Sequence, residues 1–334
     1  TADQSLINKE VTVSLKIAGS PLASAPVSFR ILAPLNPAQE IVIPVIFHVI
    51  QTEDDINLFG GKFPADKIGQ LLNKINNAFN GVSDNPVSLK TRIVFKPALY
   101  DPSGNKLSEA GVNRTVTETI AAGASNNRFA GFIIQHKLDW PVTDYLNIWL
   151  VSDRINQAGK YFGYAVSSRC VPKFYRNASA DEAPGGLTLT ENADPALEPY
   201  GTGIFYKLQN INMINRTLGS SASSIGDNEL IHYIGSYFGL LPTFKFYSSG
   251  TAAANDYCED TNDYFVNFSG GIEDNKSLVK RSDGLVFKAE NIMDDPMGVH
   301  TAVSGDQYER IVWVLNHCPG REFWKSGYAL KGVR

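Results

Sequence analysis

The ten residues Ile41–Ile50, I-V-I-P-V-I-F-H-V-I, restrict the possible folds of this chain more than any other segment. They are apolar at both odd and even positions, as expected for a strand that is covered on both faces of a sheet. A helix that spans a bilayer needs about 20 apolar residues, and this run is shorter and is interrupted by Pro44 and His48. The run therefore predicts a buried strand, and no transmembrane segment is predicted.

The composition suits a chain with a buried core. The sequence has 334 residues, of which 43% are hydrophobic and 19% are charged, enough for one large domain or two modest ones. Its 30 Lys and Arg residues nearly balance 34 Asp and Glu residues, giving a net charge of -4. This balance argues against a nucleic-acid partner, because phosphate binding needs a concentrated basic face.

Other patterns predict the elements around the buried strand. Residues 10–32 alternate between apolar and polar around a Gly-Ser-Pro turn, which predicts a β-hairpin, and the two prolines of residues 33–37 predict a linker. Residues 64–79 have the i, i+3, i+4, i+7 apolar spacing of an amphipathic helix. Two further strands are predicted at residues 91–97 and 146–151.

A second helix, predicted after residue 227, carries the main functional signal. Its apolar stripe consists of Leu230, Ile234, Tyr237, Phe238 and Leu241. Asp227 is placed to cap the start of the helix, and Gly239 is placed to end it.

This helix resembles the zinc-binding helix of metzincin proteases, H-E-x-x-H-x-x-G-x-x-H. The five motif positions fall on His232, Tyr233, Ser236, Gly239 and Pro242. In that motif three histidines bind zinc and the glutamate accepts a proton from zinc-bound water.

Three of these five positions carry a residue that cannot do the motif's chemistry. Tyr233 replaces the general base, and a tyrosine with an ordinary pKa near about 10 does not act as a base at neutral pH. Ser236 and Pro242 replace the second and third histidines, and proline has no side-chain donor for a metal. As a single remaining imidazole, His232 is expected to hydrogen-bond a neighbouring residue and not to hold a metal. The helix therefore predicts that zinc binding and peptidase activity are lost.

The surrounding segments resemble the pappalysin-like metalloproteases, particularly secreted lipoproteins of Bacteroides-type bacteria. The matching segments occur in the family's order, at residues 43–50, 75–80, 146–149, 242–244, 256–261, 291–294 and 301–315. The resemblance implies an α+β, zincin-like metalloprotease fold, with a twisted mixed sheet and helices. A hairpin module and linker (1–36) would precede a metzincin-like domain (37–334), which divides near residue 242.

The resemblance also implies roles for individual residues and an extracytoplasmic location: secreted, periplasmic or surface-anchored, with a lipid anchor upstream of Thr1 left open. Met293 would belong to the Met-turn, which lies beneath the metal in active relatives. Cys258 and Cys318 fit positions that pair in exported members. In that case Cys170 would stay unpaired, and three reduced thiols are the alternative.

An acidic cluster follows the motif helix. Carboxylates in a loop can hold calcium, which takes several oxygen ligands, although this spacing is not that of an EF-hand and a solvated loop is the alternative. Its members are Asp256, Glu259, Asp260 and Asp263.

Three functions are compatible with these features. The leading hypothesis is a pseudoprotease whose cleft binds a peptide or protein ligand, for example by strand addition at the sheet edge. The first alternative is an active zinc endopeptidase with a metal site rebuilt around His232, for example with His300. The second alternative is a structural surface protein whose cleft is filled by Tyr233, Tyr237 and Phe238.

The remaining histidines have simpler interpretations. We expect His48 to be a strand residue with satisfied hydrogen bonds, and His136 and His317 to lie at the surface.

Overall fold

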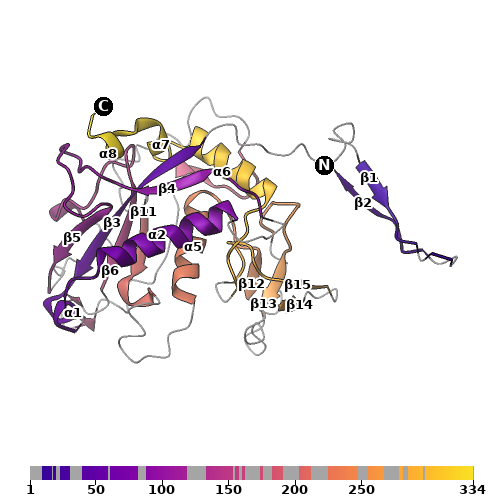
Figure 1. Cartoon of the computed structure of the whole chain (residues 1–334), viewed down its shortest axis with the longest axis horizontal. Coiled ribbons are helices and arrows are strands. Elements are labelled where there is room, and N and C mark those ends of the chain that lie inside the picture. Colours follow the sequence, from indigo (N-terminus) through magenta and orange to yellow (C-terminus); the bar gives the residue numbers. More distant parts are fainter. Residues whose placement is uncertain are drawn as a thin grey trace. The chain divides into compact units, whose positions relative to one another are not determined.

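The computed structural model divides the chain into two compact units, residues 1–39 and 40–334 (Figure 1). The sequence placed its first boundary after residue 36, and the further division near residue 242 stays a prediction. The described residues are 10–16, 18–19, 23–30, 40–58, 61–81, 88–118, 133–152, 155–157, 160–161, 174–175, 183–190, 203–211, 225–246, 255–266, 278–280, 285–295 and 298–333.

The first unit contains the predicted hairpin. Strands β1 (Glu10–Val13) and β2 (Val27–Arg30) pair antiparallel, with Glu10 opposite Arg30. An isolated bridge between Lys16 and Ala23 extends the pairing toward the turn. The linker predicted at residues 33–37 lies outside the described residues.

The second unit is built on a sheet whose described strands run in the order β11-β6-β3-β4, with β5 also paired to β3. The apolar run forms the central strand β3, in which every residue except Val42 is buried, so this prediction is confirmed. All described pairings of this sheet are parallel, where a mixed sheet was expected. Parallel strands are covered on both faces, which explains the nearly unbroken apolar sequence. The strands are β3 (Ile41–Gln51), β4 (Ile93–Pro97), β5 (Val112–Val116), β6 (Leu146–Val151) and β11 (Gly203–Lys207).

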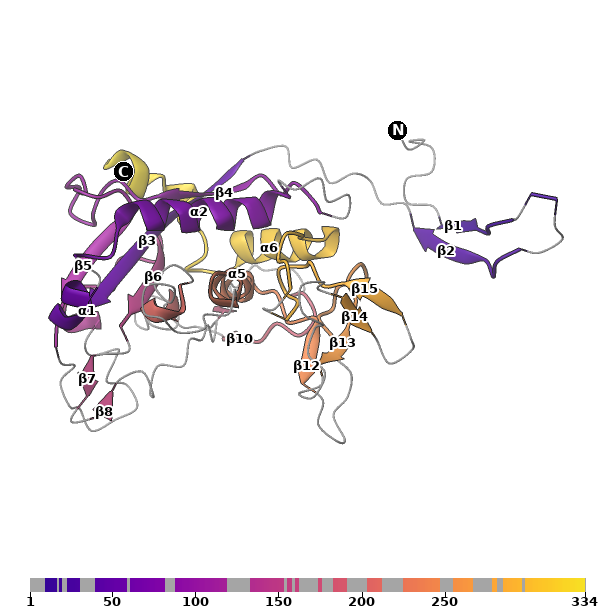
Figure 2. The same cartoon turned by 60° about the horizontal axis from the view of Figure 1, so that its bottom comes forward.

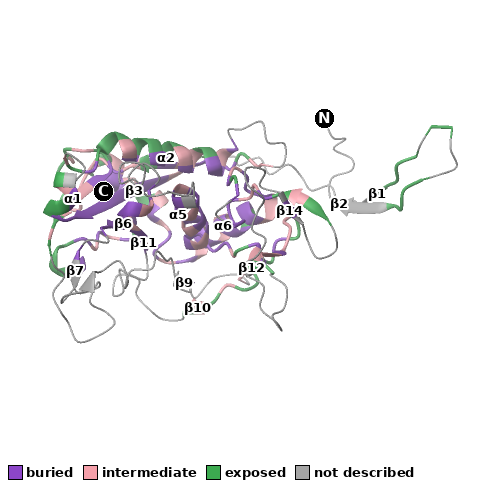
Figure 3. Cartoon of the chain, turned by 90° about the horizontal axis from the view of Figure 1, so that it is seen from below, coloured by how far each residue is buried: buried purple, intermediate pink, exposed green. Residues whose placement is uncertain are grey.

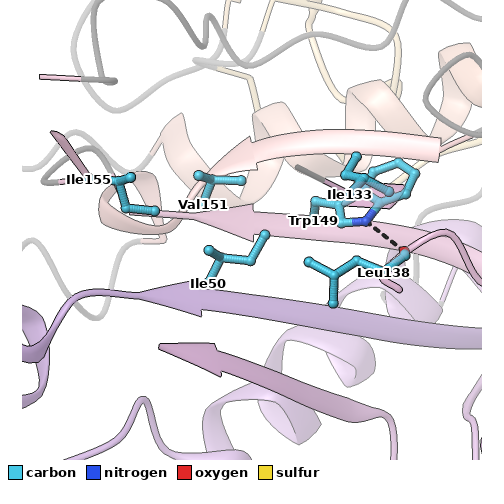
Figure 4. Packing of buried hydrophobic residues seen from close by; sticks show 6 residues of the cluster. All are labelled: Ile50, Ile133, Leu138, Trp149, Val151 and Ile155. Carbon is cyan, nitrogen blue, oxygen red and sulfur yellow. Dashed lines mark hydrogen bonds between the residues drawn. The ribbon is translucent and has the colours of Figure 1, made fainter. Parts of the chain in front are cut away.

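A hydrophobic cluster around Trp149 covers one face of the sheet (Figure 4). Ile50, Val151 and Ile155 are fully buried there, and the indole Nε1 of Trp149 donates a hydrogen bond to the carbonyl oxygen of Leu138 at 3.0 Å. The polar atom of this large side chain is therefore satisfied within the core.

His48 lies in this core with both ring nitrogens hydrogen-bonded, as predicted. The amide of Asn113 donates to Nδ1 (3.1 Å), and Nε2 then donates to Asn147 Oδ1 (3.0 Å). The ring stacks on Trp149 at 5.9 Å between centroids. Burial lowers the pKa of His48 to about 4, although the hydrogen bond to Asn147 opposes this shift.

The amphipathic helix α2 (Ala65–Asn80) packs against β4, and it buries six apolar side chains: Ile68, Leu71, Leu72, Ile75, Ala78 and Phe79. Asn76 fastens the two elements, since its Nδ2 donates to the Phe95 carbonyl (2.9 Å) and its Oδ1 accepts from the Phe95 amide (2.7 Å). The ring of Phe95 also contacts those of Phe79 in α2 and Phe238, which follows helix α5 (Ile225–Tyr237). Figure 2 shows α2 along the sheet with α5 close by.

The burial pattern separates these two helices (Figure 3). Helix α2 leaves one side exposed to solvent, whereas most residues of α5 are buried. Among the described residues no helix is long and apolar enough to cross a membrane.

The other described elements are short or follow the motif helix. Beyond the sheet, they are α1 (Glu53–Leu58), β7 (Asn156–Gln157), β8 (Lys160–Tyr161), β9 (Phe174–Tyr175), β10 (Leu189–Thr190), η5 (Leu208–Asn210), β12 (Phe244–Phe246), β13 (Tyr264–Val266), β14 (Leu278–Lys280), β15 (Val286–Lys288), α6 (Gly305–His317), α7 (Phe323–Ser326) and α8 (Tyr328–Lys331).

Candidate functional site

The motif helix α5 ends where the sequence predicted, but it begins differently. Gly239 adopts φ +88, and a Cβ there would lie 2.7 Å from Cγ2 of Val314, so the turn requires glycine. Asp227, expected as the N-cap, instead lies within the first turn. Its carboxylate pairs with Nζ of Lys74 on α2 at 3.3 Å, a tertiary contact that local sequence does not reveal.

His232 is buried on the inner side of α5. The rings of Phe244, Tyr233 and His300 surround it, with centroids at 6.0, 6.3 and 6.4 Å. Its Nδ1 is buried and has no hydrogen-bond partner in the described structure. Burial and, to a smaller extent, the nearby His300 lower the pKa of His232 to about 3, although hydrogen bonding to the Asp294 and Ile292 backbone opposes both effects. The imidazole is therefore neutral at physiological pH.

His300 is the second imidazole of the site. Its ring is 2% exposed, and its Nε2 lies 3.0 Å from the carbonyl oxygen of Asp295. The backbone has φ +51, an uncommon conformation for a non-glycine residue. Burial lowers the pKa of His300 to about 4, so it too is neutral. The structure thus brings together the two histidines that the sequence could pair only as an alternative.

Residues 291–294, which were predicted to form the Met-turn and keep that name here, make a compact loop beside His232. The amide of Met293 donates to Asn291 Oδ1, and the amide of Asn291 donates to Asp294 Oδ2, both at 2.8 Å. Thr243 ties the loop to the end of the motif segment through its own amide to the Met293 carbonyl (3.1 Å) and its hydroxyl to Asp294 Oδ1 (2.7 Å). Burial raises the pKa of Asp294 to about 7.

Helix α5 packs directly on Met293. The methionine is fully buried, and a Cβ added at Gly235 would lie 2.5 Å from its Sδ atom. A larger residue at position 235 would therefore force the Met293 side chain to move, and the predicted apolar stripe did not include Gly235. Met293 therefore packs against α5, and its assignment to a Met-turn stays a prediction.

Helix α6 fastens the Met-turn. Ser304 caps α6 and forms a capping box with Gln307. The same Gln307 exchanges two side-chain hydrogen bonds with Asn291, at 2.8 and 2.9 Å. The side chain of Gln307 thus hydrogen-bonds both the start of α6 and the Met-turn.

Arg310, one turn further along α6, holds the end of α5. Its Nε donates to the carbonyl oxygen of Gly239, and its Nη1 donates to the carbonyl oxygen of Gly185 at 2.7 Å. Gln307 and Arg310 therefore connect α6 to Asn291 and to the end of α5.

The hydroxyl of Tyr233 donates to Glu229 Oε1 at 3.1 Å. Tyr206 and Asn210 also donate to this carboxylate, at 2.9 and 3.3 Å. Neither Tyr206 nor Asn210 lies near Glu229 in the sequence, and only the i, i+4 spacing of Glu229 and Tyr233 could have indicated part of this cluster. Tyr233 is thus a hydrogen-bond donor in a structural cluster.

The donors at this site do not fit a three-ligand zinc centre. Ser236 is partly exposed, Pro242 is exposed, and neither supplies an imidazole. Within the described ranges, no group of three or more His, Cys, Asp or Glu side chains could hold a metal ion. A structural or catalytic zinc site normally needs at least three such protein ligands.

Two of the three aromatic side chains expected to fill the cleft are fully buried. Phe238 packs in the interior against the rings of Phe79 and Phe323. The ring of Tyr237 lies 3.7 Å from the Arg321 guanidinium carbon. Tyr237 and Phe238 are thus core residues, and whether the aromatic side chains fill a cleft stays a prediction.

The acidic loop makes hydrogen bonds of its own. Asp256 Oδ1 accepts from the Cys258 amide (3.0 Å) and its Oδ2 accepts from the Thr261 hydroxyl (2.8 Å). Asp260 Oδ2 accepts from the backbone amide of Asp306 at the start of α6 (3.1 Å). Burial raises the pKa of Asp256. These bonds join the loop to α6, and the calcium site stays a prediction.

Cys258 and Cys318 are both buried free thiols, so the disulfide implied by the family positions is not formed. Cys258 contacts the Asp256 carbonyl with its Sγ atom (3.7 Å), whereas Cys318 packs in a different cluster with Phe174 and Val314. Burial raises the pKa of both thiols, that of Cys318 to about 11. Cys170 lies outside the described residues.

The other predictions concern surface features away from α5. His136 is exposed, and His317 is partly buried and stacks on Trp313 at 4.8 Å. A cavity of about 400 Å³ is lined by His136, Trp140 and Arg114, among others, and by no residue of α5 or the Met-turn.

Comparison with known proteins supports the fold. No family model and no curated protein matches the sequence. Mature mirolysin of Tannerella forsythia, solved in complex with a cleaved peptide, has a TM-score of 0.55 and 17% identity, covering 89% of this chain and 100% of that one. A promirolysin mutant from the same organism has a TM-score of 0.54 and 18% identity, covering 88% of this chain and 86% of that one. Mirolysin in complex with compound 9 has a TM-score of 0.54 and 18% identity, covering 89% of this chain and 100% of that one. The chain therefore has a zincin-like metalloprotease fold.

Proposed function

We propose that this chain is a metalloprotease-like protein without zinc-dependent peptidase activity, whose cleft binds a peptide or protein ligand. The observation that carries the proposal is the donor set of α5. Of its motif positions only His232 offers a metal ligand, and that imidazole is buried among Phe244, Tyr233 and His300. Without a metal-bound water and a general base, amide hydrolysis of the zincin type has no nucleophile.

The surrounding framework supports a retained binding role. Gln307, Arg310 and Thr243 make hydrogen bonds that hold the Met-turn and the end of α5 in place. Strand β11 pairs with β6 alone among the described strands, which supports strand addition as the binding mode. The complex of mirolysin with a cleaved peptide supports a peptide as the ligand class.

The decisive test incubates the full chain with zinc and an unstructured protein substrate, with and without a chelator. We expect no chelator-sensitive cleavage, and we expect fluorescence anisotropy with a peptide library to detect binding. Chelator-sensitive cleavage would overturn the loss of activity. The absence of any peptide binding would favour a structural surface protein instead.

One observation favours the competing candidate, a zinc endopeptidase with a rebuilt site. His300 lies beside His232, as such a site would require. This candidate predicts one zinc ion per chain after reconstitution and dialysis, whereas the pseudoprotease predicts no retained zinc.

We also propose an extracytoplasmic location, which the similarity to pappalysin-like segments supports. Fractionation of cells that express the natural gene tests this location. Recovery with the membrane, periplasmic or secreted fraction is expected, and membrane recovery would point to a lipid anchor upstream of Thr1.

A further inference from the structure

The hairpin of the first unit is a sheet of two strands, in which β1 pairs with β2 alone among the described strands. The hydrogen bonds that continue the hairpin beyond β1 run toward β2 as well. The amide of Leu15 donates to Ser24 Oγ (2.9 Å), and its carbonyl oxygen accepts from the Ser24 amide (2.8 Å). Two-stranded sheets are marginally stable in water, and a strand edge offers its backbone groups to a further strand.

The residues of β1 alternate between an apolar and a polar face. Its valines at positions 11 and 13 lie opposite the apolar residues at positions 29 and 27 of β2. Leu15 continues this alternation beyond the strand. Val13 is 43% exposed and Leu15 is 77% exposed, so the apolar face is open to solvent at both residues.

The polar face of β1 carries opposite charges at its two ends. Glu10 begins the strand, and Lys16 follows it and forms the isolated bridge to Ala23. Opposite charges on directly paired residues of neighbouring strands are stabilising, and like charges are destabilising. A strand with an acid at one end and a base at the other is therefore complementary to an antiparallel copy of itself.

One register satisfies the charges and the apolar face together. When Val13 lies opposite Val13 of a second copy, Glu10 lies opposite Lys16, and Val11 lies opposite Leu15. A two-fold axis moved by one residue in either direction keeps the two faces apart but separates both pairs of opposite charges.

The outer edge of β2 offers no such match. Its sequence contains Arg30 but no acidic residue. Pro26, directly before the strand, has no amide hydrogen to donate to a neighbouring strand. The charge pattern therefore favours β1 as the strand that pairs.

We propose that β1 is a dimerisation surface, through which two copies of this chain pair antiparallel about a two-fold axis at Val13. The product is a four-stranded sheet with the order β2-β1-β1-β2. Because both copies use the same strand, the contact closes on itself and does not extend into a filament. The contact is confined to one strand per copy, so the dimer is weak and forms at micromolar concentrations. It does not depend on the proposed peptide binding.

Disulfide trapping in the full chain tests the register. Val13→Cys places two thiols opposite each other, where paired Cα atoms lie about 4.5–5.5 Å apart and a disulfide can form. Leu15→Cys is the matched control on the same face. It is the more exposed position, but its two copies would lie about 13 Å apart along the strands. Both variants are made in a Cys170→Ser background, since Cys258 and Cys318 are buried.

Mild oxidation should convert Val13→Cys to a covalent dimer about tenfold faster than Leu15→Cys, because only the first pair of thiols is held together. A non-reducing gel measures both rates. Equal rates, or a faster reaction of Leu15→Cys, would indicate random collision and overturn the proposal. The absence of a covalent dimer in both variants would overturn it as well.

Sedimentation velocity of the protein without added cysteines tests the charge pattern. The wild type should shift from monomer to dimer over an about hundredfold rise in concentration. Lys16→Glu should weaken the dimer by about tenfold, because it places a carboxylate opposite Glu10 of the other copy on both sides of the axis. Within its own hairpin Lys16 faces Ala23, so the substitution creates no like-charge pair there.

Lys16→Arg keeps the charge and should dimerise like the wild type. A wild type that stays monomeric at every concentration would overturn the proposal. A dimer that Lys16→Glu leaves unchanged would place the contact elsewhere on the chain and would overturn it too.

Discussion

The side-chain amides of Asn291 and Gln307 form a reciprocal pair, each donating a hydrogen bond to the oxygen of the other. The two residues belong to the Met-turn and to helix α6. Gln307 also accepts from the amide of Ser304 at 3.1 Å, so three hydrogen bonds meet at one fully buried side chain.

Gln307→Leu should therefore destabilise the protein by about 2–4 kcal/mol. The substitution leaves the side-chain amide of Asn291 without its hydrogen-bond partner and removes the capping box of α6. Urea denaturation measures the change. The control is Glu309→Gln on the exposed side of the same helix, which should stay within about 0.5 kcal/mol of the wild type. Equal stability of both variants would contradict the structural role of the amide pair.

Gly235→Ala should destabilise the protein although alanine favours helices. The new Cβ would lie 2.5 Å from Sδ of Met293, and overpacking of this kind costs about 1–3 kcal/mol. Thermal and urea denaturation measure the effect. In the Met293→Ala background the same Gly235→Ala substitution should cost less, since the two positions are in contact.

Gly69→Ala on α2 is the matched control, because a Cβ there meets no atom within 4 Å. It should stabilise the helix by about 0.5–1 kcal/mol. If Gly235→Ala were stabilising as well, α5 would not pack on the Met-turn as described.

The stability of the folded chain should fall as the pH drops below about 6.5. His232, His300 and His48 are buried with pKa values of about 3, 4 and 4, all lowered from 6.5 by burial. Below pH 6.5 the unfolded chain therefore binds protons that the folded chain does not bind. The stability contributed by the three neutral histidines is complete above pH 6.5 and is lost as the pH falls toward 4 and 3. Asp294, whose pKa burial raises to about 7, acts in the opposite direction, but it is one group against three.

The variant His300→Asn isolates one of these groups. Between pH 6 and 4.5 the slope of the unfolding free energy against pH should decrease by up to about 1.4 kcal/mol per pH unit, the value for one proton. Urea denaturation at pH 4.5, 5.5 and 6.5 measures the slope. An unchanged slope would show that His300 is already protonated in the folded chain.

Restoring the motif should restore zinc binding. The variant Tyr233→Glu/Ser236→His/Pro242→His adds two imidazoles and a carboxylate to a framework that Thr243, Gln307 and Arg310 hold in place. Elemental analysis after zinc reconstitution and dialysis should find one zinc ion per chain. Adding His232→Ala should abolish it, and a zinc-free restored variant would indicate that the site has collapsed.

Elements whose buried side chains follow a regular spacing along the sequence could be predicted. Strand β3 and helix α2 follow directly from their apolar spacing, and Gly239 ends α5 as expected. The parallel direction of the described sheet pairings did not follow, because period-two and continuous apolar patterns carry no strand direction. The ion pair of Asp227 could not be predicted from the sequence either, because its partner Lys74 lies on another helix.

At the candidate site, the motif positions could be read from spacing, but their contacts could not. His300 lies 6.4 Å from His232 because the Met-turn region folds back onto α5, and no local pattern encodes this approach. The hydrogen bonds from Tyr206 and Asn210 to Glu229 likewise depend on the placement of β11 and the turn after it.

Strand β3 pairs with β4 along its first half, with β5 along its second half and with β6 on the other side. A slip of β3 by one residue would turn its side chains to the opposite faces and break all three ladders together. The register of the four segments between residues 41 and 151 is therefore constrained jointly, because no one of the three ladders can shift alone.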